Sequence, residues 1–380
     1  MIFEFLFWGA LGTLVYVYFG FILILLMASK IKGRPVVKKD ILPSVSIIIS
    51  AHNEEKHIER KIENCMNLDY PKDRMEIVVV SDGSTDRTNA ILGEIRNPLL
   101  KAHFMPQAQG KTECQNAAVE ISNHDVLFFT DATVMHPENA VRLLVKSLHD
   151  PSVGCVTGKP IFNRDEGATS KGLSKRDQYE LYLRSKLGDV HSLFGAQDCI
   201  YVIPRRLYSF VKPDLDSGFV GPLKILEKGY RTVYEPEALA FVDRPAPRVE
   251  DEFARRSRIV LRGMRGLIHM RQLMNPFMHG CVALSLVSTR LLRWLSPVFI
   301  SLLFLSNLFL LDSPFYLVMF VLQLAFYLVA FIAFLLERRG YLIGSIFYIP
   351  LYFCTLTLAA TVGLKKLLAG ETGQVWQTRR

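Results

Sequence analysis

The sequence has 380 residues, half of them hydrophobic, and a formal net charge of +9. A mean hydropathy of +0.22 is too high for an ordinary soluble enzyme, yet the centre of the chain has mixed polarity and is long enough for one domain with a sizeable core. The basic excess favours anionic lipid headgroups or a phosphate-bearing substrate as partners, and no nucleic-acid recognition module accompanies it. The six cysteines include no Cys-x-x-Cys pair, which favours a reducing compartment.

The first hydrophobic segment, residues 2–28, is long enough to cross a bilayer. It is followed by the basic stretch KIKGR at residues 30–34 rather than by a small-residue cleavage signature. Residues 1–29 are therefore predicted to form an uncleaved transmembrane anchor. Because basic flanks favour the cytoplasmic side, the domain that follows is expected in the cytosol.

Across residues 40–248, strand-like runs alternate with helical patterns, which predicts an α/β domain with a mostly parallel sheet. Two β-branched runs, at residues 45–49 and 76–80, are typical of parallel strands buried on both faces. Each run ends in a polar turn, SAHNEE at residues 50–55 and SDGSTD at residues 81–86. Ligands bind beyond the carboxyl ends of parallel strands, so both turns are expected to face one crevice. Further strands are predicted at residues 99–105, 126–130, 153–158, 199–203 and 231–234, and helices around 58–62 and 88–92 and at 112–121, 137–149, 179–187 and 219–228.

Residues 250–270 have a helical pattern with an apolar side and an arginine-rich side, which predicts an amphipathic helix at a membrane surface. A solvated charged helix is the alternative. Residues 277–295 are apolar but carry Arg290 and Arg293, which are costly in the middle of a bilayer. Residues 249–295 are therefore expected to form interfacial helices.

Hydrophobic runs at residues 297–311, 315–336 and 341–364 predict a set of transmembrane segments within residues 296–364. Three crossings would leave the basic tail, residues 365–380, outside the cytosol. Two crossings with a re-entrant or interfacial segment, or four crossings, would keep the tail inside. Its positive charge favours the inside.

Polar side chains at the predicted strand ends could carry chemistry. Asp82 could accept hydrogen bonds from a base or ribose, while Gly83 lets backbone come close. Asp131, followed by Thr133, could hold a divalent metal across a diphosphate, because Mg²⁺ and Mn²⁺ take hard oxygen ligands. Lys111 could neutralise phosphate. For each aspartate, an ordinary turn or a helix cap is the alternative.

Two further segments contain candidate residues. A carboxylate in PDLDSGF, residues 213–219, could remove a proton from an acceptor hydroxyl. Capping of the following helix by Asp216 or Ser217 fits this segment equally well. The arginines at positions 255, 256 and 258 could bind phosphate, lipid headgroups or both.

Taken in order, these motifs resemble the inverting family-2 glycosyltransferases with a GT-A fold, and in particular membrane-integrated synthases of the cellulose, hyaluronan and poly-N-acetylglucosamine type. The resemblance covers nearly the whole chain and includes LEKGYRTVYEPEA at residues 226–238, which in the family follows the catalytic base. The donor-binding residues that it implies are Ala51, Asn53, Glu54, Asp82, Gly83, Lys111, Asp131, Arg258 and, in a tail motif of hyaluronan-type synthases, Trp376, Thr378 and Arg379. The acceptor-binding residues that it implies are Gln197, Asp198 and Arg255.

The sequence departs from the family in its metal and base motifs. The metal motif reads Asp-Ala-Thr, so the resemblance implies Mg²⁺ or Mn²⁺ held by Asp131, the diphosphate, water and Thr133. By register with the helix, the family's paired acids fall on Ser217 and Gly218. Asp216 is then displaced by one position, and it is the predicted catalytic base, with Asp214 as the alternative.

A third departure concerns the acceptor. The family's Gln-x-x-Arg-Trp motif appears as RRSRI at residues 255–259, which keeps the arginine and lacks the tryptophan. The missing aromatic platform weakens the case for a processive synthase that holds a long polymer.

The resemblance therefore implies an integral protein of a bacterial or archaeal plasma membrane with a cytosolic catalytic domain. It would transfer a sugar from a nucleotide-diphosphate sugar, UDP-linked in the first instance, to a growing polysaccharide or a lipid-linked acceptor and form a β-glycosidic bond. The alternative is a catalytically impaired partner subunit that binds nucleotide-sugar within a synthase complex. A transporter is a weaker reading, because the hydrophobic segments show no evident repeats.

Overall fold

The computed structural model describes residues 1–31, 33–162, 181–188, 190–242, 249–339, 341 and 344–372. These residues divide into two compact units. Residues 1–31, 181–183, 249–339, 341 and 344–371 belong to the helical unit, and residues 33–162, 184–188, 190–242 and 372 belong to the sheet unit. The predicted tail residues Trp376, Thr378 and Arg379 lie outside the described residues.

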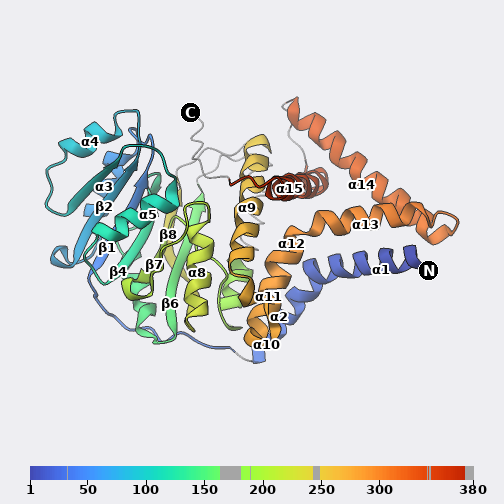
Figure 1. Ribbon diagram of the computed structural model, residues 1–380, viewed down its shortest axis with the longest axis horizontal. Helices are drawn as coiled ribbons and strands as arrows, with labels where there is room; N and C mark the ends of the chain where they lie inside the picture. The colour runs from blue at the N-terminus through green and yellow to red at the C-terminus, as the bar shows by residue number, and fades with distance from the viewer. Residues whose placement is uncertain are drawn as a thin grey trace. The chain divides into compact units, whose positions relative to one another are not determined.

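The sheet unit is built on one eight-stranded sheet with the order β3-β2-β1-β4-β7-β6-β8-β5. Figure 1 labels β1, β2, β4, β6, β7 and β8 of this sheet. The strands are β1 (Val45–Ala51), β2 (Met75–Asp82), β3 (Leu100–Met105), β4 (Val126–Asp131), β5 (Val134–Met135), β6 (Val153–Phe162), β7 (Tyr201–Pro204) and β8 (Arg231–Val242). Strands β3, β2, β1 and β4 pair in parallel, and so do β6 and β8. Strand β7 runs antiparallel between β4 and β6, and β5 runs antiparallel to β8. The predicted mostly parallel α/β sheet is confirmed.

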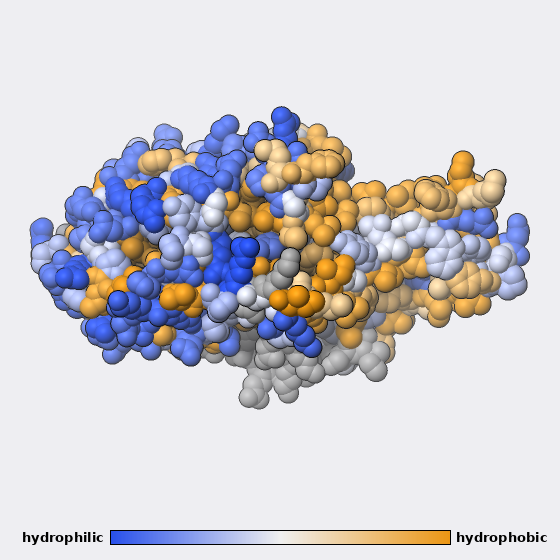
Figure 2. Space-filling model, turned by 90° about the horizontal axis from the view of Figure 1, so that it is seen from below, coloured by the Kyte–Doolittle hydropathy of each residue, from blue (hydrophilic) through white to orange (hydrophobic). Residues whose placement is uncertain are grey.

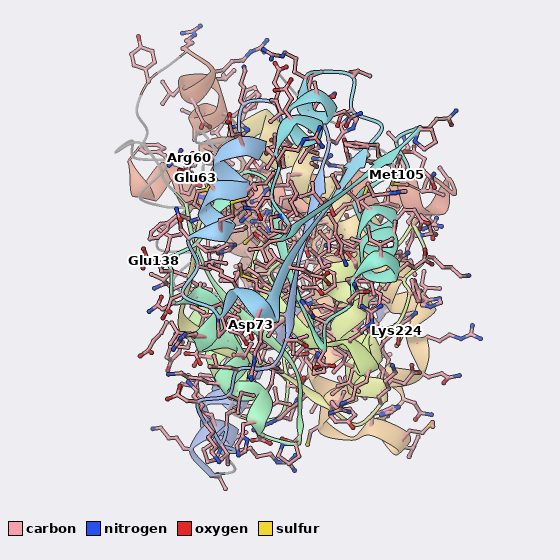
Figure 3. The ribbon with its side chains drawn as sticks, turned by 90° about the vertical axis from the view of Figure 1, so that its left-hand side faces the viewer. Arg60, Glu63, Asp73, Met105, Glu138 and Lys224 are labelled. Atoms are coloured by element: carbon pink, nitrogen blue, oxygen red, sulfur yellow. The ribbon has the colours of Figure 1, made fainter. Side chains whose placement is uncertain are left out.

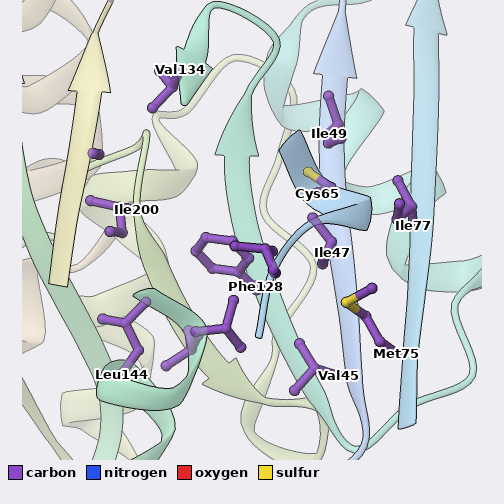
Figure 4. Packing of buried hydrophobic residues seen from close by; sticks show 14 of the residues in the cluster. Val45, Ile47, Ile49, Cys65, Met75, Ile77, Phe128, Val134, Leu144 and Ile200 are labelled. Atoms are coloured by element: carbon purple, nitrogen blue, oxygen red, sulfur yellow. The ribbon is translucent and has the colours of Figure 1, made fainter. Parts of the chain in front are cut away.

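Helices cover both faces of this sheet because its central strands are apolar on both sides. Val45 and Ile49 of β1 point to a core formed with α3 (Ile58–Met66), α4 (Thr88–Glu94) and α6 (Ala140–Lys146), part of which Figure 4 shows. Ile48 points to the other core, formed with α5 (Lys111–Ile121) and α8 (Ser217–Glu227). Figure 3 shows the two layers, with Arg60 of α3 and Lys224 of α8 on opposite sides of the sheet.

The bounds of several elements differ from the prediction, and three of these differences have a clear structural origin. The helix expected from residue 137 begins at Ala140 and closes in a short 3-10 turn, Ser147–His149. The two-residue strand β5 was not predicted, since two residues show no periodicity. The strand expected over residues 199–203 begins only at Tyr201, because the backbone N–H of Ile200 closes a turn by donating to the carbonyl of Gln197 at 2.9 Å.

The helical unit contains the hydrophobic segments. Its helices are α1 (Ile2–Val15), α2 (Phe21–Ile31), α9 (Val249–His269), α10 (Pro276–His279), α11 (Cys281–Leu286), α12 (Leu292–Trp294), α13 (Ser296–Leu308), α14 (Pro314–Arg338) and α15 (Ser345–Leu368). A π-helical turn, Tyr16–Gly20, joins α1 to α2 into one continuous rod. On the face seen in Figure 2, hydrophobic residues gather over this unit and hydrophilic residues over the sheet unit.

Three described helices are long and apolar enough to cross a membrane: Ile2–Ile31, Pro314–Arg338 and Phe347–Leu368. The pair Cys281–Trp294 and Ser296–Leu308 would count as a fourth only as one broken span, because it is bent by 60°. With 13 residues, α13 alone is about 20 Å long, less than the hydrocarbon thickness of a bilayer. The crossing expected at residues 297–311 is therefore not a lone helix.

Helix α9 buries its apolar side inside the helical unit. Leu261 and Leu267 are buried, whereas Ile259 is exposed, and the predicted position of this helix at a membrane surface stays a prediction. Gly363 lets α15 approach closely, since a Cβ there would lie 2.8 Å from the carbonyl oxygen of Ser257. Gly263 likewise leaves space for the ring of Trp294, since a Cβ on residue 263 would lie 2.3 Å from that ring.

Candidate active site

The two polar turns at the carboxyl ends of β1 and β2 are hydrogen-bonded to each other. The amide of Asn53 donates to Ser84 Oγ at 3.1 Å, and the amide of Thr85 donates to Asn53 Oδ1 at 2.8 Å. Asn53 has a φ of 55°, a left-handed conformation that asparagine tolerates better than most side chains. The two turns thus meet at one edge of the sheet, as expected, and Ala51 lies buried at the end of β1 beneath them.

Asp82 fixes a third loop at this edge. Its two carboxylate oxygens accept the backbone N–H groups of Gln109 at 2.6 Å and Gly110 at 2.8 Å. Gly83, with a φ of +58°, lets the loops approach, because a Cβ there would lie 2.6 Å from the amide nitrogen of Ala108. Asp82 is fully buried, so in this structure it positions the start of α5, and its predicted contact with a nucleoside stays a prediction.

The loop held by Asp82 delivers Lys111 to the end of β4. The Lys111 ammonium donates to Asp131 Oδ1 at 2.5 Å, and the two side chains are 17% and 15% exposed. Burial on its own would lower the pKa of Lys111, but the carboxylates of Asp131 and Asp198 raise it above the ordinary value. A fixed, charged lysine beside a strand-end carboxylate is suited to binding phosphate and its counterion.

A fully buried lysine side chain is hydrogen-bonded to Thr130, the residue before Asp131 in β4. The Lys61 ammonium, on α3, donates to Thr130 Oγ1 at 3.0 Å and to the carbonyl of Val134 at 2.5 Å, and Thr130 Oγ1 is also 2.7 Å from His136 Nε2. Burial lowers the pKa of Lys61, and burial together with Lys61 lowers the pKa of His136 far below its usual range. This cluster was not predicted from the sequence, although Lys61 follows Ile58 by three residues and therefore falls on the buried face of the helix.

Residues 46–203, which contain all of these groups, match the protein family described as Glycosyl transferase family 2. They form a family 2 glycosyltransferase domain. The domain includes every strand from β1 to β7 except the first residue of β1 and the last of β7.

The chain is similar in sequence to two kinds of named bacterial protein. Over 127 residues the chain is 41% identical to the probable glycosyltransferase YdaM of Bacillus subtilis, a match that covers 31% of this chain and 30% of that protein. Over 222 residues it is 25% identical to the poly-β-1,6-N-acetyl-D-glucosamine synthase of Staphylococcus aureus, which covers 55% of this chain and 52% of the synthase. The chain therefore spans about a third to a half of these relatives' lengths.

The fold of the glycosyltransferase domain and its flanking helices has a solved counterpart. The mannosyltransferase PcManGT of Pyrobaculum calidifontis, solved with GDP-mannose and Mn²⁺, superposes with a TM-score of 0.73 over 96% of this chain and 99% of its own. The two sequences are 18% identical, so the likeness shows the GT-A type of fold.

A divalent cation fits the residues at the end of β4. Thr133 Oγ1 is buried and has no hydrogen-bond partner among the residues that the structure describes. Asp131 offers a second oxygen besides the one that Lys111 contacts. No group of three or more His, Cys, Asp or Glu side chains in the described ranges could hold a metal alone. Such a site would take its other ligands from a diphosphate and water, as Mg²⁺ and Mn²⁺ sites often do.

The remaining predicted site residues fall in different places. Asp216 caps α8, since its Oδ1 accepts the backbone N–H of Phe219 at 3.1 Å, and Asp214 is half-buried three residues before the helix. Gln197 and Asp198 lie in the turn before β7. Arg255 and Arg258 are on α9 of the helical unit, and Glu54 anchors its turn through its amide, which donates to Thr88 Oγ1 at 2.8 Å. The catalytic, donor and acceptor roles assigned to these residues stay predictions.

Proposed function

We propose that this chain is a membrane-bound inverting glycosyltransferase that uses a nucleotide-diphosphate sugar and builds a β-linkage on a polysaccharide or lipid-linked acceptor. The observation that carries the proposal is the Lys111–Asp131 pair, held where the ends of β1, β2 and β4 meet. Two interlocked turns and a loop anchored on a buried carboxylate surround that pair. The family 2 match and the named glycosyltransferase relatives support the same reaction class.

The donor would lie along this edge of the sheet. Its nucleoside would face the turns that contain Asn53 and Gly83, and its diphosphate would face Lys111 and Asp131. Lys111 is already oriented and partly buried, so its charge can stabilise the departing diphosphate without reorganisation. Asp131 and Thr133 would hold a Mg²⁺ or Mn²⁺ ion, which when bound supplies Lewis-acid stabilisation of the same developing charge.

The acceptor hydroxyl would attack the anomeric carbon from the face opposite the diphosphate. One displacement inverts that centre and gives a β-linkage from an α-linked donor. A carboxylate must take the hydroxyl proton. Asp216, one position before the place where the motif register puts the family's acids, is the predicted base, with Asp214 as the alternative. Oδ1 of Asp216 accepts the helix-capping hydrogen bond, so proton transfer would use the other carboxylate oxygen.

The membrane context is part of the proposal. The apolar helices in the described part of the chain support residues 1–29 as an anchor and residues 296–364 as transmembrane segments. Residues 40–248 would form the cytosolic catalytic domain, with interfacial helices at 249–295 and a basic cytosolic tail at 365–380. The staphylococcal relative is named a poly-β-1,6-N-acetyl-D-glucosamine synthase, which supports a polysaccharide acceptor.

The test is transfer by the full chain in membranes. UDP-N-acetylglucosamine and GDP-mannose, each with a labelled sugar, are supplied with Mn²⁺, and label is followed into lipid and polymer fractions. We expect one donor to label a fraction, and Asp131→Ala to abolish that labelling. Full activity of Asp131→Ala contradicts the assignment of the donor site.

The second candidate is a non-catalytic nucleotide-sugar-binding partner of a synthase complex. It is favoured by the absence of an acid at positions 217 and 218, where the paired carboxylates of the family would fall. Binding of both labelled donors without turnover by the purified chain would support this candidate and contradict the first.

A further inference from the structure

The first turn of α8 is packed against a carboxylate from another part of the chain. Gly218 has no side chain, and a Cβ built on it would lie 1.5 Å from Oδ1 and 2.7 Å from Cγ of Asp198. A carbon and an oxygen only 1.5 Å apart are at the distance of covalently bonded atoms, so the two cannot coexist. The Asp198 carboxylate therefore occupies the space that a side chain on residue 218 would fill.

The backbone around both residues is fixed by hydrogen bonds. The amide of Ala196 donates to the carbonyl of Gly218 at 2.8 Å, which ties the Asp198 turn to the start of α8. The amide of Gln197 donates to Thr157 Oγ1 at 2.8 Å and ties the same turn to β6. Asp198 is thus held by two elements, and its position over Gly218 follows from the backbone.

The start of α8 is in turn fixed to the helix that begins with Lys111. Ser217 Oγ and Gln115 Oε1 are 2.5 Å apart, and Thr112 Oγ1 donates to the carbonyl of Leu215 at 2.8 Å. The carboxylate above Gly218 therefore lies over a helix start that is hydrogen-bonded to the first turns of α5, the helix that begins with Lys111.

We propose that Asp198 is the general base of sugar transfer and replaces, in space, a carboxylate on residue 218. The inference rests on the proposed function. As the acceptor oxygen forms its bond to the anomeric carbon, the hydroxyl proton passes to the Asp198 carboxylate. The bond between that carbon and the diphosphate oxygen breaks, and its electron pair leaves with the nucleoside diphosphate. The acceptor role predicted for Asp198 becomes a direct contact with the reacting hydroxyl, and Asp216 remains the cap of α8.

The first experiment removes the charge and keeps the shape. Asp198→Asn in the full chain, in membranes with Mn²⁺ and whichever of the two labelled donors the unsubstituted chain uses, should lower transfer by about 10²-fold or more, because general-base catalysis contributes on that scale. Binding of the same donor should be unchanged. Asp73→Asn, on the exposed turn before β2, is the matched control. Transfer by Asp198→Asn within about threefold of the control overturns the inference.

The second experiment moves the carboxylate back onto the helix. Asp198→Gly/Gly218→Asp clears the overlap and places an acid in the first turn of α8, where the helix dipole favours it. Its matched control, Asp198→Gly/Gly218→Ala, has the same cleared space and no carboxylate. We expect the aspartate pair to exceed the alanine pair in transfer by about tenfold or more, with equal donor binding. A purely structural Asp198 predicts equal transfer by the two pairs, which overturns the inference.

Two further outcomes distinguish failure of the Asp198 assignment from failure of the proposed function. Loss of transfer in Asp216→Asn together with normal transfer in Asp198→Asn overturns the inference. It supports Asp216 as the base, as predicted from the sequence, and is consistent with the proposed function. No transfer by the unsubstituted chain with either donor contradicts the proposed function and the inference with it.

Discussion

The ammonium of Lys111 and the carboxylate of Asp131 form an ion pair across the ends of two elements, α5 and β4. Both side chains are largely shielded from solvent, so neither charge is fully screened. A diphosphate entering this edge of the sheet would meet a cation that is already in place.

Lys111→Met should lower kcat/KM for the donor by about 10²-fold or more, because loss of one preorganised electrostatic contact to a developing anion costs on that scale. The measurement is initial-rate transfer in membranes at fixed Mn²⁺. Lys212→Met, which removes an exposed lysine, is the control. An equal fall of kcat/KM in both variants would mean that the overall positive charge of the protein, rather than the Lys111–Asp131 contact, sets the transfer rate.

Removal of divalent cations with EDTA should abolish transfer, and Mn²⁺ or Mg²⁺ should restore it. The variant Thr133→Val then tests whether the Thr133 hydroxyl, which has no hydrogen-bond partner among the described residues, is a metal ligand. Deleting a buried, unbonded hydroxyl is neutral or stabilising in a purely structural role. If Thr133 is a ligand, the Mn²⁺ concentration for half-maximal transfer rises while the Tm does not fall. An unshifted Mn²⁺ dependence would remove Thr133 from the metal site.

Gly83→Ala should destabilise the sheet unit by about 1–3 kcal/mol, because the residue combines a positive φ with backbone 2.6 Å from the new Cβ. Donor affinity should fall as the Asp82-anchored loop shifts. Gly93→Ala, in the exposed part of α4 with no atom within 4 Å of the new Cβ, should raise stability slightly. Thermal unfolding and donor binding measure both effects, and similar behaviour of the two variants would refute the argument.

Acid should weaken the sheet unit through His191. Burial and the neighbouring Arg34 lower the pKa of His191 from 6.5 to about 4. Below pH 6.5 the unfolded chain binds a proton that the folded chain does not, so this contribution to stability is intact above pH 6.5 and is lost progressively as the pH falls to 4. Tm measured from pH 7.5 to 4.5 should fall less steeply in His191→Gln than in the unsubstituted chain. Parallel curves would contradict the prediction.

Gly363→Leu should loosen the packing of α15 on α9, since overpacking typically costs about 1–3 kcal/mol. The new side chain would meet backbone at 2.8 Å and the side chain of Val260 at 2.9 Å. Gly12→Leu, on α1 with no atom within 4 Å, is the matched control. The readout is Tm of the full chain in detergent, and an equal Tm for the two variants would contradict the close packing.

Local patterns in the sequence predicted much of the fold. The β-branched runs that became β1 and β2 are buried on both faces in the structure, and the turns after them meet as expected. Boundaries failed where tertiary contacts decide them, as at β5, which exists only because it pairs with β8. The site was harder to predict. Asp82 is fully buried and binds backbone amides, and Lys61, which is also fully buried, is of a residue type that normally lies on the surface.

By itself, the sequence determined the layers of the domain, the edge where ligands would bind and the membrane-length segments, because hydrophobic periodicity and polar strand ends are local signals. Only the tertiary structure decided which side chains share a space. Asp198 and Gly218 are twenty positions apart, and no pattern along the chain links a turn before β7 to the first turn of α8. Their relation arises from backbone hydrogen bonds and packing between distant elements, which place one residue's carboxylate where another residue has no side chain.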